Sequence, residues 1–139
     1  MTAESASNNY DMKSFDIQAA LKSVGKLRVD RETTSDEASG AMKILGNFNK
    51  CMVGMASFSG LTPWERHQDD ELLQIMEGEV DLTILTEDKA CKTTLTKDSI
   101  FIVPRGLWHN QSSPQGVKLI FITSQQGNET SEEHPRVST

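Results

Sequence analysis

Between residues 41 and 124 the chain consists of short runs rich in Val, Ile, Thr, Phe and Leu, separated by turn residues at close intervals. This pattern is typical of β-sandwiches and β-barrels. Because no part of the region has a helical period long enough to supply a crossover, neighbouring strands should run antiparallel. We therefore expect an all-β domain with strands near residues 41–48, 51–59, 65–67, 71–76, 79–85, 91–95, 99–103, 108–111 and 117–123.

The segments on either side of this region differ from it in composition. Residues 14–24 place apolar side chains at helical spacing, with Ser14 as a candidate N-cap, which predicts one short helix. The two ends of the chain are polar and lack periodicity, so we expect them to be flexible. The predicted organisation is a flexible tail over 1–13, a helix and lead-in strand over 14–40, a barrel over 41–124 and a flexible tail over 125–139.

Length and charge argue against several classes of function. The chain has 139 residues, which suits one domain, and its net charge of -6 argues against a surface that neutralises nucleic-acid phosphates. Its longest apolar run is far below the roughly 18 to 20 residues that a membrane-spanning helix needs. Residues 1–10 also lack the pattern of a secretion signal, so we expect no membrane partner and a cytoplasmic location. Cys51 and Cys91 fit no metal-binding spacing and should be unpaired thiols.

Acidic and imidazole side chains stand beside apolar runs at two places in the predicted barrel. Glu65 and His67 would point the same way on a strand, because side chains alternate between its two faces. Glu71 can supply a third group after a short link, and His109 a fourth after the turn at 104–106. Two carboxylates that share a buried pocket cannot both stay ionised without a cation between them, unless at a large energetic cost. The pattern predicts a divalent metal site with Glu65, His67, Glu71 and His109 as ligands.

Four further side chains near these residues, or of the same type, have less specific interpretations. Gln111 shares a face with His109 and is expected to line the same pocket. Arg66 should face away from the pocket and Arg105 lies in a turn, so both should form surface ion pairs. His134 lies in the polar C-terminal segment, and we expect no role for it.

These residues resemble the motifs of the cupin superfamily. The first cupin motif runs Gly, five residues, His-x-His, three or four residues, Glu, six residues, Gly. In this chain His67, Glu71 and Gly78 match it with intervals of three and six residues. Glu65 stands at the first histidine position, and Gly60 lies one residue closer than the pattern asks.

The second cupin motif runs Gly, five residues, Pro-x-Gly, two residues, His, three residues, Asn. Pro104, Gly106 and His109 match this motif, while Asp98 replaces its glycine and Ser113 replaces its asparagine. The resemblance covers roughly residues 41–124 and implies an antiparallel jelly-roll barrel with one divalent metal ion inside. Carried across, His67, Glu71 and His109 take the places of metal ligands.

The resemblance leaves both the metal and the role of Glu65 open. Two imidazoles and a carboxylate suit iron and also accept manganese, zinc or nickel. Glu65 either binds the metal in place of an imidazole, or accepts a hydrogen bond from a ligand, or acts as a general base, which makes it the candidate catalytic residue.

Three functions remain open on these grounds. The first is a metal-dependent enzyme of dioxygenase or isomerase type that acts on a small organic molecule. The second is a non-catalytic cupin that binds a small ligand or a metal, and the third is a degenerate barrel without metal. Because cupins commonly cover a sheet edge by pairing an N-terminal strand, residues 26–31 (KLRVDR) could mediate a homodimer.

Overall fold

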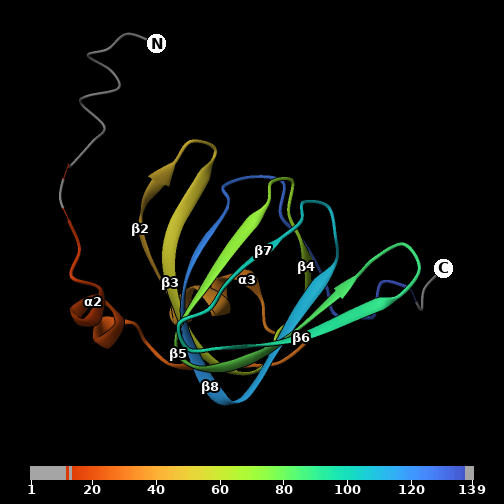
Figure 1. Cartoon of the computed structure of the whole chain (residues 1–139), viewed down its shortest axis with the longest axis horizontal. Coiled ribbons are helices and arrows are strands. Elements are labelled where there is room, and N and C mark those ends of the chain that lie inside the picture. Colours follow the sequence, from red (N-terminus) through yellow and green to blue (C-terminus); the bar gives the residue numbers. More distant parts are fainter. Residues whose placement is uncertain (1–11, 13, 137–139) are drawn as a thin grey trace, which may run out of the picture.

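Two long strands form the centre of a single curled sheet, which has nine strands within the part of the chain that the structure describes (Figure 1). The structure is a computed structural model that describes residues 12 and 14–136; apart from Met12, the predicted N-terminal tail lies outside the described residues. Strands β5 (Glu71–Leu85) and β8 (His109–Ser124) pair antiparallel from Leu72 to Ile84, with two register shifts. The predicted all-β fold with antiparallel pairing of its main strands is thereby confirmed.

Each central strand was expected as two shorter strands, and each is instead continuous. Gly78 lies opposite Val117 and has a φ of 75°, and a Cβ added to it would clash with the carbonyl of Gly116, whose φ is 105°. The residues around Gly78 therefore form an irregularity inside β5, between two stretches paired with β8, rather than a turn that ends the strand.

The remaining strands extend the sheet from these two. On one side β8 pairs with β3 (Cys51–Leu61), and the far edge of β3 carries β2 (Met42–Phe48) and β1 (Leu27–Val29). On the other side β5 pairs with β6 (Ala90–Thr96) and β7 (Ile100–Val103). The short strand β4 (Trp64–Arg66) pairs with both β8 and β9 (Glu129–Ser131).

One strand pair departs from the expected antiparallel arrangement. β1 runs parallel to β3, with Leu27 opposite Phe58. The segment 26–31, expected to cover the edge of a partner chain, thus covers the edge of β3 in its own chain. Gly60 permits this close approach, because it has a φ of 103° and an added Cβ would clash with the Val29 carbonyl. The homodimer stays a prediction.

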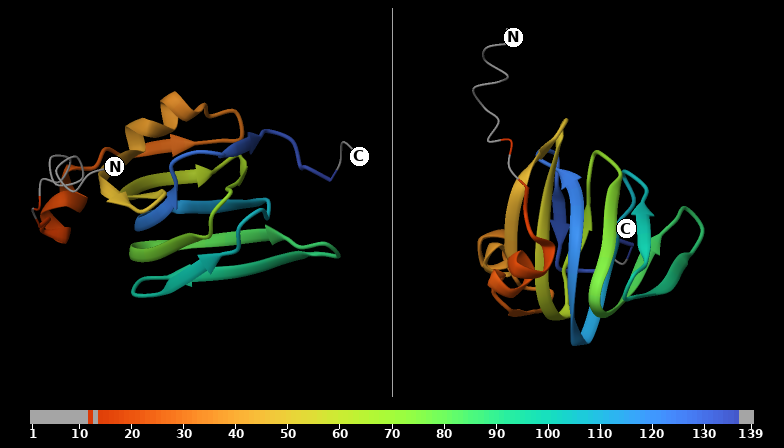
Figure 2. Two further views of the ribbon diagram at one scale, coloured as in Figure 1. Left: turned by 90° about the horizontal axis from the view of Figure 1, so that it is seen from above. Right: turned by 60° about the vertical axis from the view of Figure 1, so that its left-hand side comes forward.

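The predicted N-terminal helix is present as α2 (Ile17–Ser23), but its N-cap is Asp16 rather than Ser14. The Asp16 Oδ1 atom accepts a hydrogen bond from the Ala19 amide at 2.8 Å. Leu21 of this helix is buried with Met55 of β3, on a face of the sheet outside the main core. Figure 2 shows α2 beside the curled strands rather than inside them.

A second helical segment was not predicted. Helix α3 (Ser35–Ala38) and the 3₁₀ turn η1 (Ser39–Ala41) follow β1. Thr34 and Glu37 cap α3 reciprocally, each side chain accepting from the other residue's amide. Four residues are too few to show a helical period, so the capping box was the only local signal.

The apolar core lies inside the curl of the sheet. Most strands contribute inward-facing side chains to one main cluster. Its most deeply buried members are Leu73, Ile75, Val80, Leu82, Val103 and Leu119.

Two further expectations concern the described residues. Cys51 and Cys91 are free and half-buried, as expected. No helix in the described part of the chain is long and apolar enough to cross a membrane.

The C-terminal segment, expected as a flexible tail over 125–139, reaches back to the barrel. β9 pairs with β4, placing Thr130 opposite Glu65. His134 makes an edge contact with the buried Trp64 ring, with centroids 5.0 Å apart. This part of the chain is therefore packed against the strand that carries one of the predicted ligands.

Candidate metal centre

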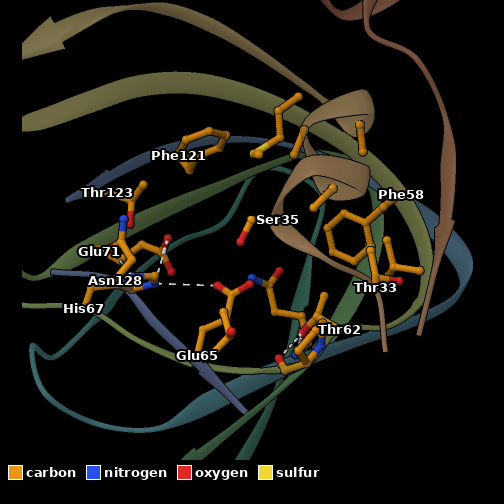
Figure 3. Close-up of a pocket in the computed structure, with 18 of the residues that line it drawn as sticks. Thr33, Ser35, Phe58, Thr62, Glu65, His67, Glu71, Phe121, Thr123 and Asn128 are labelled. Atoms are coloured by element: carbon orange, nitrogen blue, oxygen red, sulfur yellow. Dashed lines mark hydrogen bonds and ion pairs between the residues drawn. The ribbon is translucent and has the colours of Figure 1, made fainter. Parts of the chain in front are cut away.

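The structure brings the four predicted ligand residues together at one end of the barrel. Glu65 lies on β4 and His67 directly after it, while Glu71 and His109 are the first residues of β5 and β8. Glu65 is the register partner of His109. His67, Glu71 and His109 are buried, whereas the side chain of Glu65 is 34% exposed. Figure 3 shows Glu65, His67 and Glu71 around a common cavity.

The Glu71 carboxylate lies between the two imidazoles. Its Oε2 atom is 3.5 Å from His67 Nε2, and its Oε1 atom is 3.3 Å from His109 Nε2. Glu65 Oε2 lies 3.7 Å from His67 Nε2, and one ligand atom each of Glu65, His67 and His109 fall within 4.8 Å of one another. Two ligand atoms that each lie about 2.1 Å from one ion are about 3.0–3.4 Å apart. The pairs at 3.3, 3.5 and 3.7 Å are close to this spacing, whereas the group of Glu65, His67 and His109 atoms would have to contract around a metal.

Both imidazole rings are held from behind through their Nδ1 atoms. His109 Nδ1 donates to the Leu107 carbonyl at 3.1 Å, and His67 Nδ1 donates to Asn128 Oδ1 at 2.7 Å. The Asn128 amide is itself oriented, because its Nδ2 atom donates to the Ser124 carbonyl at 3.0 Å. In a neutral ring this leaves the lone pair on Nε2, which is the tautomer that binds a metal.

Three of the converging atoms are buried without a hydrogen-bond partner in the part of the chain that is described. They are His67 Nε2, Glu71 Oε1 and His109 Nε2. Buried polar atoms nearly always have a partner, and a cation at this point would contact all three. The side chains present therefore fit a divalent ion.

Without a metal, the same proximity shifts the pKa of each group. Burial alone would lower the pKa of His67, but the negative charge of the Glu71 carboxylate beside Nε2 raises it to about 9. Burial also acts to lower the pKa of His109, but Glu71 outweighs this effect and the pKa is raised. Burial would raise the pKa of Glu71, but the two imidazoles lower it to about 2. Burial and then the charge of Glu71 raise the pKa of Glu65.

Asn128 is the residue of the site that sequence reasoning missed. It immediately precedes β9, in the segment that was assigned to a tail. Gly127 has a φ of 75°, a left-handed conformation that favours glycine in the turn that delivers Asn128. Nothing in the local sequence distinguishes this asparagine, because its partner lies 61 residues away.

A cavity of about 290 Å³ adjoins the carboxylates. Gln111 lines it, as predicted, whereas the contribution of residues 33–41 was not predicted. Figure 3 shows Ser35 of α3 over the cavity and Phe58 and Phe121 at its sides. His109 is not among the lining residues and is 1% exposed, so it contacts the site from behind the cavity wall.

The two arginines form surface ion pairs, as expected. Arg66 pairs with Glu129 of β9, and its guanidinium lies 4.6 Å from the ring centre of Trp108. Arg105 Nε lies 3.5 Å from Asp70 Oδ1. Neither arginine lines the cavity.

Comparison with known proteins identifies the fold. A germin-like protein, subfamily 2 member 4, from Arabidopsis thaliana is 30% identical over 108 residues, which cover 73% of this chain and 49% of that protein. A cupin-2 domain protein from Shewanella frigidimarina matches with a TM-score of 0.51 and 21% identity, over 60% of this chain and 79% of its own. The chain has the cupin fold. No protein-family model matches it.

A second similar structure is an enzyme of this fold. Hydroquinone 1,2-dioxygenase from Sphingomonas, solved with 4-hydroxybenzoate bound, matches with a TM-score of 0.55 and 14% identity, over 63% of this cupin and 66% of its own chain. At this identity the match shows the fold alone. The chain also spans only about half the length of the curated germin-like relative.

The two departures from the second cupin motif leave the site intact. Asp98, in place of glycine, has a φ of 71°, so the turn keeps the left-handed conformation that glycine favours. Ser113, in place of asparagine, is buried and donates to the Glu79 carbonyl at 2.6 Å. In this cupin neither position contributes to the cluster of converging ligand atoms.

In chelator-treated protein, His67 should titrate near pH 9 rather than near 6.5. Because its folded pKa is raised, its contribution to stability is complete below pH 6.5 and is lost as pH rises through about 9. Glu71→Gln removes the neighbour that raises the pKa of His67 most, so the pKa should then fall from about 9, although Glu65 and Asn128 still raise it. NMR titration of the imidazole Cε1–H measures both values. An unshifted His67 in the metal-free wild type would contradict the ion-pair geometry.

Asn128→Ala should weaken Co²⁺ binding by roughly 10–100-fold, because the His67 ring loses the acceptor that orients it. Asn128→Asp keeps an acceptor and should restore most of the affinity. Asn47→Ala, on exposed β2, is the matched control. Competition with a chromophoric chelator gives the affinities. Equal affinities for Asn128→Ala and the control would show that Asn128 does not position the ring.

Proposed function

We propose that this cupin is a metal-dependent enzyme that acts on a small organic molecule held in the cavity beside the carboxylates. His67, Glu71, His109 and Glu65 would hold one divalent ion. The observation that carries this proposal is the set of three buried ligand atoms without partners, two of them on imidazoles whose Nδ1 atoms are already bound elsewhere. A structural role alone would not require both rings to direct their free nitrogen atoms at the same carboxylate.

The donor set limits the chemistry. Two imidazole nitrogens with two carboxylates suit iron, manganese, zinc or nickel, and the carboxylates neutralise the charge of a divalent ion. When bound, such an ion would polarise the oxygen atoms of a substrate. The chain's own contribution is to orient the ligands from behind and to surround the substrate with apolar side chains that exclude water.

Glu65 differs from the other three residues in its access to the cavity. Its side chain is the most exposed of the four, and Figure 3 shows it beneath the cavity. We propose that it is the fourth ligand, since one of its oxygen atoms belongs to the group within 4.8 Å that includes both imidazoles. The alternative is a general base that moves a substrate proton, which the position beside the cavity also permits.

The reaction class rests on weaker support than the site. The similarity to hydroquinone 1,2-dioxygenase supports oxygen-dependent chemistry, and an isomerase is the alternative enzyme type. A non-catalytic binder and a degenerate barrel are the competing functions. The binder would show no turnover, and the degenerate barrel would hold no metal.

Protein purified without chelator should contain about one equivalent of divalent metal, and His67→Ala or His109→Ala should remove it, since each deletes one imidazole ligand. His134→Ala is the matched control, because that ring contacts Trp64 and lies away from the cluster. Elemental analysis by inductively coupled plasma mass spectrometry measures the content. Metal retained in both ligand variants would refute the site, and wild type without metal would favour the degenerate barrel.

Glu65→Gln should weaken metal binding by more than the roughly 10–100-fold that loss of an outer hydrogen-bond partner costs, because it removes a ligand charge. Glu129→Gln is the matched control, since Glu129 also lines the cavity but pairs with Arg66. Metal affinity and oxygen uptake with a panel of phenols and diketones are measured together. Unchanged affinity with lost turnover would assign Glu65 as a general base instead. Oxygen uptake by the wild type would support an oxygen-dependent enzyme over a non-catalytic binder.

A further inference from the structure

The cavity beside the proposed metal centre has an unusual charge distribution. Among the described residues that line it, the ionisable ones are Glu65, His67, Glu71 and Glu129, and none is lysine or arginine. Arg66, which follows Glu65 in the sequence, does not line the cavity. Its guanidinium group pairs with Glu129 and lies over the Trp108 ring. The wall therefore offers no lysine or arginine to an anionic ligand, and the charge that His67 carries without a metal is already paired with Glu71 and Glu65.

The proposed centre itself adds little attraction for an anion. Two carboxylates, Glu65 and Glu71, would balance the charge of a divalent ion. A carboxylate ligand would then carry an uncompensated negative charge into a largely apolar space, which is strongly unfavourable. A neutral ligand avoids this penalty.

The size and the apolar lining of the cavity point to a compact hydrocarbon body. Phe58, Phe121, Leu73 and Leu119 line its inner part. The volume of about 290 Å³ is roughly twice that of a 150 Å³ apolar cavity that binds benzene. A substituted six-membered ring fits this space.

Two residues of β8 that line this space each carry a polar atom without a partner among the described residues. Gln111 Oε1 and Thr123 Oγ1 are buried without a hydrogen-bond partner in the described part of the chain, and both residues line the cavity. Gln111 is 9% and Thr123 6% exposed, so neither atom is well satisfied by bulk water. A ligand that carries a hydroxyl or amide group would supply the missing partners.

We infer that the cavity binds an uncharged, largely apolar molecule about the size of a substituted benzene ring, through a hydroxyl or amide group that hydrogen-bonds Gln111 or Thr123. This inference names the substrate class of the proposed function and depends on that function for its catalytic meaning. The selectivity itself depends only on the lining residues, so it can be measured with or without metal.

The test uses isosteric pairs of probes, 3- and 4-hydroxybenzamide against 3- and 4-hydroxybenzoate, titrated calorimetrically into metal-loaded and chelator-treated protein. The neutral amide of at least one pair should bind at least about tenfold more tightly than its carboxylate, because only the carboxylate brings an unpaired charge. Gln111→Lys places a cation on the wall and should narrow or reverse this preference. Gln115→Lys, the same substitution at an exposed position outside this cavity, should leave it unchanged.

Three outcomes would overturn the inference. They are equal or tighter binding of the carboxylates, absence of binding by every amide at millimolar concentration, and an unchanged preference in Gln111→Lys. These outcomes are distinguishable from failure of the proposed function. Protein that holds no metal but still prefers the amides would support this inference while refuting the metal enzyme, and metal-loaded protein that prefers the carboxylates would do the reverse.

Discussion

The contact of the Glu71 carboxylate with two buried imidazoles is the interaction on which the rest of the site depends. Its two oxygen atoms face the Nε2 atoms of His67 and His109, and all three side chains are almost fully removed from solvent. Leaving one such polar group unpaired costs on the order of 1–3 kcal/mol or more. The barrel therefore holds these groups together only when positive charge lies among them, carried either by protons on the rings or by a metal ion.

The barrel achieves this arrangement with the ends of its strands. Glu71 and His109 begin the two longest strands, and β4 adds Glu65 opposite His109. The residues that follow Glu71, such as Leu73 and Ile75, belong to the main apolar core. The predicted ligand residues are thus fixed by the packed core directly beside them, which limits how far they can move apart.

The sequence predicted those parts of the fold and the site that depend on local spacing. Alternation along a strand placed Glu65 and His67 on one face, and turn residues bounded most of the strands. What it missed depends on contacts between distant segments: the parallel pairing of β1 with β3, and the Asn128 amide 61 residues from His67. It also interpreted the residues around Gly78 as a turn, because only pairing with β8 shows that the strand continues.

The position of Asn128 also bears on the order of events during synthesis. When His67 and Glu71 leave the ribosome, the strand that carries His109 and the amide that orients the first ring have still to be translated. The nascent chain consequently presents an incomplete and unoriented set of donors, and non-local contacts of this kind form late. Under the proposed function, ion uptake would follow closure of the whole domain, so that the finished fold, rather than the emerging peptide, would select the ion.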